Sequence, residues 1–124
     1  FIMTGFDYMS ARDWARFGLL HLQNGMWGEE RILPDFWSDF VSTPAPASAN
    51  QGYGGLFWLN ARGAYDRIPT DAYWPSGFMG QTTMIIPSKK LVIVRLGPSP
   101  GDFAPYLNKI VGDIVEAIGE PGGG

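Results

Sequence analysis

The sequence predicts an α+β domain in which an antiparallel sheet of at least three strands packs against helices. Two hydrophobic runs, 74–87 and 91–97, are separated by only Ser-Lys-Lys and predict a β-hairpin. Residues 103–118 repeat apolar side chains at the i, i+3, i+4 spacing of a helix. With two further helices expected before the strands, the order favours an antiparallel meander with the last helix on one face.

The first predicted helix begins at Ser10, a hydroxyl N-cap followed three residues later by Asp13. It runs to about Asn24, and Gly25 suits the position that ends it. Apolar side chains cover most of its circumference, so we expect deep packing. They are Trp14, Ala15, Phe17, Leu19, Leu20 and Leu22.

A turn with a short extended piece follows at 26–31, and Pro34 suits the first position of a second helix over 34–42. The apolar stripe of this helix consists of Phe36, Trp37, Phe40 and Val41. The connector 43–50 carries two prolines that prevent a helix from continuing, so we expect irregular backbone.

The first strand is predicted over 52–60, followed by a loop over 61–75 and then by the hairpin. Because 91–96 is apolar almost throughout, both faces of that strand should be covered. Asp102 can cap the last helix and Gly119 can end it, with Tyr106 among its core-facing residues.

Composition bounds the function classes. The 124 residues carry a net charge of −3 without long charged blocks, which argues against nucleic-acid binding. Cysteine is absent, which excludes disulfides and thiolate metal sites, and no cofactor or metal motif stands out. No apolar run approaches the ~20 residues of a membrane span. The chain opens at Phe1 in apolar residues, from which we expect 1–119 to be the C-terminal part of a longer domain and 120–124 a flexible tail.

Common catalytic motifs are missing from these 124 residues. Neither Gly-x-Ser-x-Gly nor Ser-x-x-Lys occurs, and His21 is the only histidine. His21 lies among leucines within a packed helix, which favours a structural role. Tyr106-Leu-Asn108 matches Tyr-x-Asn, but two specified residues match by chance often, so we interpret it as part of the last helix.

Three segments together resemble the C-terminal part of the serine β-lactamase and penicillin-binding-protein superfamily. The resemblance is to the branch with class C β-lactamase-like esterases and 6-aminohexanoate-oligomer hydrolases. The segments are Ser10–Gly25 with Arg31–Pro34, then Gly52–Leu59, then Ser76–Pro87 with Leu91–Val94. Their order and spacing cover nearly the whole chain. The resemblance implies part of a β-lactamase-like fold of bacterial origin and leaves the compartment open.

In that family Ser-x-x-Lys supplies nucleophile and base, Tyr-x-Asn assists proton transfer, and Lys-Thr-Gly lies on a strand edge. The third motif falls here at Pro75-Ser76-Gly77, with the lysine replaced. The resemblance implies that the backbone N–H of Phe78 completes an oxyanion hole and that Ser76 contacts substrate or the proton relay. It implies an ester, small amide or β-lactam as substrate, with nucleophile and base in an upstream part of the fold. The chain alone is therefore expected to be inactive.

Other interpretations stay open. Ser76-Gly77 can be a simple turn into a hairpin, and Trp74, Tyr73 and Tyr65 can line a substrate cleft or cover the sheet. The chain can also be a non-catalytic α+β module that self-associates or binds a protein partner through an apolar surface or a strand edge.

Overall fold

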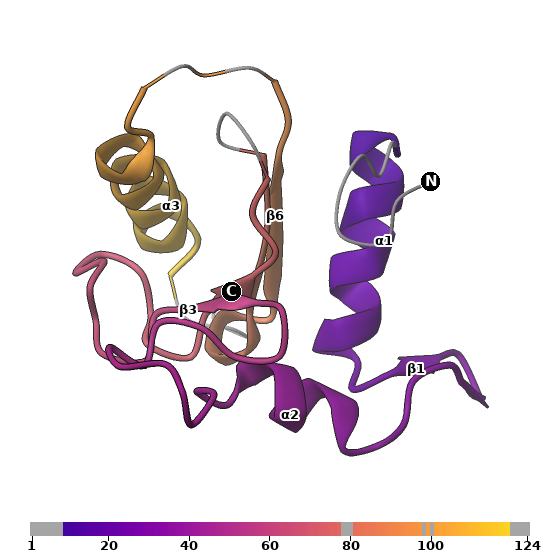
Figure 1. Ribbon diagram of the computed structural model, residues 1–124. Coiled ribbons are helices and arrows are strands. Elements are labelled where there is room, and N and C mark those ends of the chain that lie inside the picture. Colours follow the sequence, from indigo (N-terminus) through magenta and orange to yellow (C-terminus); the bar gives the residue numbers. More distant parts are fainter. Residues whose placement is uncertain (1–8, 78–80, 98, 100, 120–124) are drawn as a thin grey trace.

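The computed structural model describes residues 9–77, 81–97, 99 and 101–119, and its architecture is α+β. A sheet lies between helix α1 (Ala11–Leu22) on one face and helix α3 (Ala104–Ile118) on the other, as Figure 1 shows. The predicted α+β class with an antiparallel sheet and three helices is confirmed. None of the described helices is long and apolar enough to cross a membrane.

The main sheet is an antiparallel meander in the order β3 (Trp58–Leu59), β4 (Tyr73–Trp74), β5 (Thr82–Ile86), β6 (Leu91–Arg95). Strand β4 lies inside the predicted loop 61–75, so that assignment was wrong there. Two residues are too few to show an alternating pattern, and β4 exists because its neighbours pair with it on both sides.

The predicted hairpin is confirmed only in part, because β5 and β6 pair from Thr82↔Arg95 to Ile86↔Leu91. A single strand over 74–87 was wrong: Trp74 belongs to β4, and Ser76 pairs antiparallel with Thr82. The 3₁₀ turn Pro87–Lys89 joins β5 and β6, and Lys90 closes it with a φ of 49°. All five residues of β5 are buried, whereas those of β6 are half-buried. The predicted coverage of both faces of 91–96 is confirmed for β6, because Val92 lies against Gly18 of α1, and Leu91 and Ile93 pack against the core cluster on the α3 side. The residues of β6 remain half-buried because it is the edge strand of the sheet in the described part of the chain.

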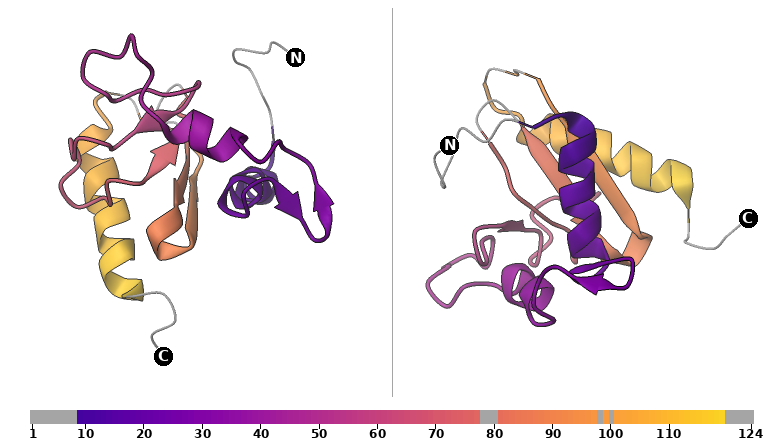
Figure 2. Two further views of the ribbon diagram at one scale, coloured as in Figure 1. Left: turned by 90° about the horizontal axis from the view of Figure 1, so that it is seen from below. Right: turned by 90° about the vertical axis from the view of Figure 1, so that its right-hand side faces the viewer.

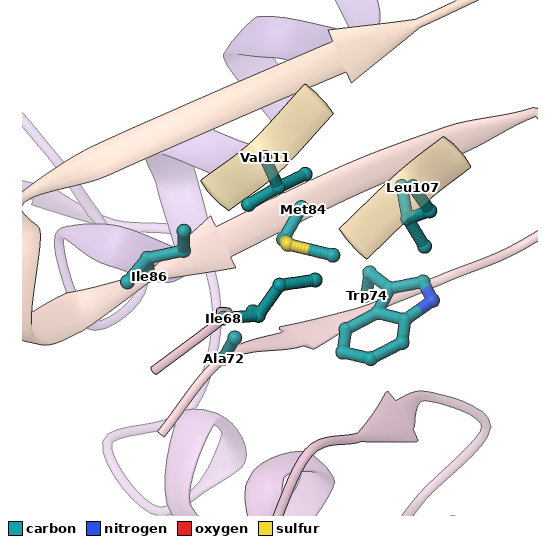
Figure 3. Packing of buried hydrophobic residues seen from close by; sticks show 7 residues of the cluster. All are labelled: Ile68, Ala72, Trp74, Met84, Ile86, Leu107 and Val111. Atoms are coloured by element: carbon teal, nitrogen blue, oxygen red, sulfur yellow. The ribbon is translucent and has the colours of Figure 1, made fainter. Parts of the chain in front are cut away.

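The sheet divides the core in two. The cluster on the α3 face is shown in Figure 3 and consists of Ile68, Ala72, Trp74, Met84, Ile86, Leu107 and Val111. The cluster on the other face consists of Val41, Phe57, Leu59, Tyr73 and Ile85. Neighbouring residues of one strand therefore serve opposite cores, as the pleat requires.

Helix α1 lies across β5 and β6 (Figure 2), and the predicted N-cap is confirmed because the Asp13 N–H donates to Ser10 Oγ at 3.1 Å. Only Gly18 and His21 of the helix are buried, so the expected deep packing was wrong. The helix approaches the sheet closely on one side alone. A Cβ on Gly18 would lie 2.6 Å from Val92 Cγ1, which explains a glycine in mid-helix.

A small hairpin of β1 (Met26–Trp27) and β2 (Glu30–Arg31) leads to helix α2 (Trp37–Ser42). Helix α2 begins three residues later than predicted, because Pro34 forms a turn whose carbonyl accepts from the Trp37 N–H at 3.0 Å. Val41 is fully buried, whereas Phe36 and Phe40 are exposed.

The predicted strand 52–60 is reduced to β3 and one bridge between Tyr53 and Trp58. A tight turn interrupts it: the Gly54 N–H donates to the Phe57 carbonyl at 2.8 Å, and Leu56 has a φ of 70°. A leucine in this region of φ is uncommon, and its side chain is 76% exposed.

Helix α3 matches its prediction closely, with the Ala104 N–H donating to Asp102 Oδ1 and Gly119 at its C-terminal end. Tyr106 is 64% exposed, so its predicted core position was wrong. Asn108 bonds the Arg67 N–H and the Asp66 carboxylate. One flank of α3 therefore faces the loop between β3 and β4, and Tyr106 lies on the opposite flank.

Candidate functional site

Ser76 and Gly77 continue the line of β4 past its last residue, and both are exposed. The Gly77 N–H donates to the Gln81 carbonyl at 2.8 Å, and the Thr83 N–H donates to the Pro75 carbonyl at 3.4 Å. These two bonds enclose the bridge between Ser76 and Thr82. In such a pair the enclosed residues make no ladder bonds to each other, so the N–H and C=O of Ser76 point away from β5.

In the described part of the chain, no strand pairs with Ser76 on the edge toward which its N–H and C=O point. Strand β3 pairs with β4 only through Trp58↔Trp74 and Leu59↔Tyr73. Before Trp58 the turn at Gly54–Phe57 takes the chain away, so β3 does not extend alongside Ser76. Donors and acceptors at an open strand edge are available to another backbone or to a substrate.

Phe78, the predicted oxyanion donor, lies outside the described residues. Gln81, the next described residue, is anchored to Gly97 through its side chain. Its side-chain oxygen accepts from the Gly97 N–H at 3.0 Å, and its amide nitrogen donates to the Gly97 carbonyl.

A hollow of about 360 Å³ lies beside Ser76, between the β3–β4 side of the sheet and the first turn of α3. The structure brings three of the predicted site residues together there: Ser76, Trp74 and Tyr65. The Tyr65 ring meets Trp74 edge-on at 5.6 Å between centroids. The remaining lining residues are Asn50, Gly52, Trp58, Leu59, Ala64, Thr82, Phe103, Ala104 and Leu107.

Tyr73 does not join them, because it is buried in the cluster on the opposite face of the sheet. Its ring packs against Phe57 at 5.7 Å, and it is 2% exposed. Burial raises the pKa of Tyr73 to about 12, so the phenol stays protonated at neutral pH. Tyr73 covers the sheet, whereas Trp74 and Tyr65 both pack in the core and border the hollow.

Sequence reasoning missed Trp58 and Thr82 as lining residues. Trp58 is 48% exposed beside Tyr53, an unusual exposure for a tryptophan in a strand. The signal for Thr82 was a hydroxyl within an otherwise apolar strand, although Thr83 carries the same signal on the other face.

His21 is buried, and both ring nitrogens are occupied. Nδ1 lies 2.9 Å from the Phe17 carbonyl, and Trp37 Nε1 donates to Nε2 at 3.3 Å. Nδ1 therefore carries the proton. Burial lowers the pKa of His21, in opposition to the bond with the Phe17 carbonyl, which raises it. This environment agrees with the structural role predicted for His21.

We expect His21 to make the fold less stable in mild acid. Its folded-state pKa is lowered, so below the unfolded value of about 6.5 the unfolded chain binds more protons and the free energy of unfolding falls. His21→Gln removes this titration. Urea unfolding at pH 7 and pH 5 should show a smaller loss of stability for the variant than for the unmodified chain, and equal losses would contradict the assignment.

Within the described residues, no group of three or more histidine, aspartate or glutamate side chains is arranged to hold a metal ion. No protein-family model matches the chain. The chain is 27% identical over 99 residues to an uncharacterised protein of Alkalihalophilus pseudofirmus. The match covers 71% of this chain and 29% of that protein, so the chain spans less than a third of the curated relative it matches.

Proposed function

We propose that this chain is part of a serine hydrolase of the β-lactamase and penicillin-binding-protein superfamily, in which it supplies the oxyanion strand. The observation that carries the proposal is the open backbone edge at Ser76, beside a hollow lined by aromatic rings. An exposed strand edge next to a concave surface suits a substrate that bonds through its own carbonyl or amide.

The reaction begins when a serine oxygen attacks the substrate carbonyl, whose oxygen becomes an oxyanion. Backbone N–H groups stabilise this charge, and the proposal assigns one of them to Phe78. Collapse expels the alcohol or amine and leaves an acyl-enzyme, which water then hydrolyses. One such donor lowers the activation free energy by roughly 3 kcal/mol. The nucleophile and its lysine are assigned to sequence outside these 124 residues, which contain no Ser-x-x-Lys.

Pro75 occupies the position of the family's lysine and has no charge to offer a substrate carboxylate. The proposal therefore favours esters and small amides over β-lactams, whose carboxylate needs a cation.

The test uses the coding region extended upstream of Phe1. The extended protein should carry Ser-x-x-Lys and be labelled at that serine by a fluorophosphonate probe, whereas the 124-residue chain should remain unlabelled. Phe78→Pro removes the proposed donor and should lower kcat on a p-nitrophenyl ester by about 100- to 1000-fold. Phe78→Ala keeps the N–H and serves as the matched control. An extended protein without the motif, or a Phe78→Pro variant as active as Phe78→Ala, would refute the proposal.

A second candidate, self-association, is favoured by the surface around β6. Strand β6 is the edge of the sheet in the described part of the chain and is apolar apart from Arg95. Tyr106 and Ile110 are exposed on the flank of α3 away from the β3–β4 loop. This flank lies toward β6, because Tyr106 stacks with Phe103, whose ring lies under Arg95. An apolar edge strand flanked by exposed apolar side chains can pair with a second copy.

We expect light scattering after size exclusion to give a dimer mass if this second candidate holds. Ile110→Glu places a charge on the exposed flank and should shift the mass to that of a monomer. Ala61→Glu adds the same charge to the loop that follows β3, at the opposite edge of the sheet, and should leave the mass unchanged. A cleanly monomeric unmodified chain would exclude self-association.

A further inference from the structure

The hollow beside Ser76 is lined mainly by aromatic and aliphatic side chains. Trp58, Tyr65 and Phe103 contribute aromatic surface, and Leu59 and Leu107 contribute aliphatic surface. No lysine, arginine, aspartate or glutamate is among the described residues that line it. A volume of about 360 Å³ is near the lower end for small-molecule sites.

The polar groups of the hollow are few and uncharged. Ser76 and Thr82 face each other across the β4–β5 bridge, and Asn50 supplies an amide. These groups can bond a carbonyl or an amide but cannot neutralise an ion. Burial raises the pKa of the Tyr65 phenol, and the nearby carboxylate of Asp102 raises it further. The same carboxylate would repel an anionic ligand.

We propose that this hollow binds an uncharged aromatic group, with its ring among Trp58, Tyr65 and Phe103 and its carbonyl or amide at Ser76. Offset or edge-to-face contacts with aromatic walls favour a planar ring over an aliphatic chain of equal size. The use of this hollow for the acyl group of a substrate rests on the proposed function, whereas the binding itself does not.

The binding is tested on the 124-residue chain with three probes. Phenylacetamide is neutral and aromatic, phenylacetate is its anionic counterpart, and acetamide lacks the ring. In ¹H–¹⁵N NMR titrations, phenylacetamide should shift the amides of Ser76, Thr82 and Leu107 with millimolar affinity. Phenylacetate should bind at least about tenfold more weakly, because its charge would enter a lining without a cation. Acetamide should leave these signals unchanged.

A matched pair of variants locates the site. Ala64 is an exposed loop residue that lines the hollow, so Ala64→Trp fills it from outside with little demand on the core. Ala61 is exposed in the same loop and is not part of the lining, so Ala61→Trp is the control. Affinity for phenylacetamide should fall at least about tenfold in the first variant and stay unchanged in the second.

Equal binding of phenylacetate, or unchanged binding by Ala64→Trp, would overturn this inference. Failure of the proposed function gives a different result, because the chain would bind phenylacetamide while the extended protein failed to hydrolyse esters. Conversely, the extended protein could be active, hydrolyse phenylacetyl and acetyl esters equally and fail to bind phenylacetamide. That result would refute ligand binding in the hollow and leave the proposed hydrolase function intact.

Discussion

Asn60→Asp is expected to lower the free energy of unfolding by about 3 to 5 kcal/mol at pH 7. Asn60 is fully buried, and its amide nitrogen donates to the carbonyls of Tyr65, Ile68 and Pro69 at 3.0, 2.7 and 3.3 Å. Its oxygen accepts from the Tyr65 N–H at 2.9 Å. A carboxylate keeps only this last bond and faces three carbonyl oxygens without a proton to share.

The sign of the pH dependence follows from the same contacts. The buried carboxyl would take up a proton more readily than in the unfolded chain, so its folded-state pKa would be raised. Stability would then be greatest in acid and be lost as pH rises above about 3.9. Urea unfolding should therefore show a smaller penalty at pH 4.5 than at pH 7.

Asn50→Asp is the matched control for this prediction. Asn50 is exposed, and its side-chain oxygen accepts from the Gly52 N–H at 3.0 Å, a role that a carboxylate fills equally well. Its effect should stay within about 0.5 kcal/mol. If the two variants were equally stable, Asn60 would not organise the β3–β4 loop that places Tyr65 beside the hollow.

The helices were predictable because their signals are local. The hydroxyl of Ser10 and the carboxylate of Asp102 act on backbone within three residues, and the spacing of Leu107 and Val111 needs only the geometry of one helix. The β5–β6 hairpin has two apolar strands of five residues joined by a short turn, which is also a local pattern.

The parts that failed depend on contacts between distant segments. Strand β4 has two residues and is defined by its pairing with β3 and β5. Tyr106 fits the apolar spacing of α3, but its ring is 64% exposed on the flank opposite the β3–β4 loop. The sequence pattern could not show which flank the sheet would leave uncovered.

The candidate site was predictable in part for the same reason. The sequence pattern placed Ser76-Gly77 at the entry of a strand over 74–87, whereas in the structure Ser76 follows the end of β4 and pairs with Thr82. The strand edge at Ser76 is open in the described part of the chain. The hollow joins residues from 50 to 107, so no single pattern contains it. The alternation of a strand separates Tyr73 from Trp74, but only after β4 is known to be a strand.

Gly54→Ala is expected to cost about 3 kcal/mol, the upper part of the range for overpacking. A Cβ on Gly54 would lie 2.4 Å from the Val41 carbonyl oxygen and 2.7 Å from that of Thr43. Both are backbone atoms at the end of α2, so they cannot turn aside as a side chain can. Gly54 also donates the bond to Phe57 that closes the turn before β3.

Gly52→Ala separates this steric effect from the general cost of replacing a glycine. Neither Gly52 nor Gly54 has a positive φ, so alanine suits both backbones. The nearest atom to a Cβ on Gly52 is Asn50 Oδ1 at 3.1 Å, at the end of a side chain that can move. Urea unfolding should place Gly52→Ala within about 1 kcal/mol of the unmodified chain. Because the turn at Gly54 keeps β3 short, only Gly54→Ala should also shift the NMR signals of Trp58 and Ser76, and unchanged signals would mean that another constraint holds this strand edge open.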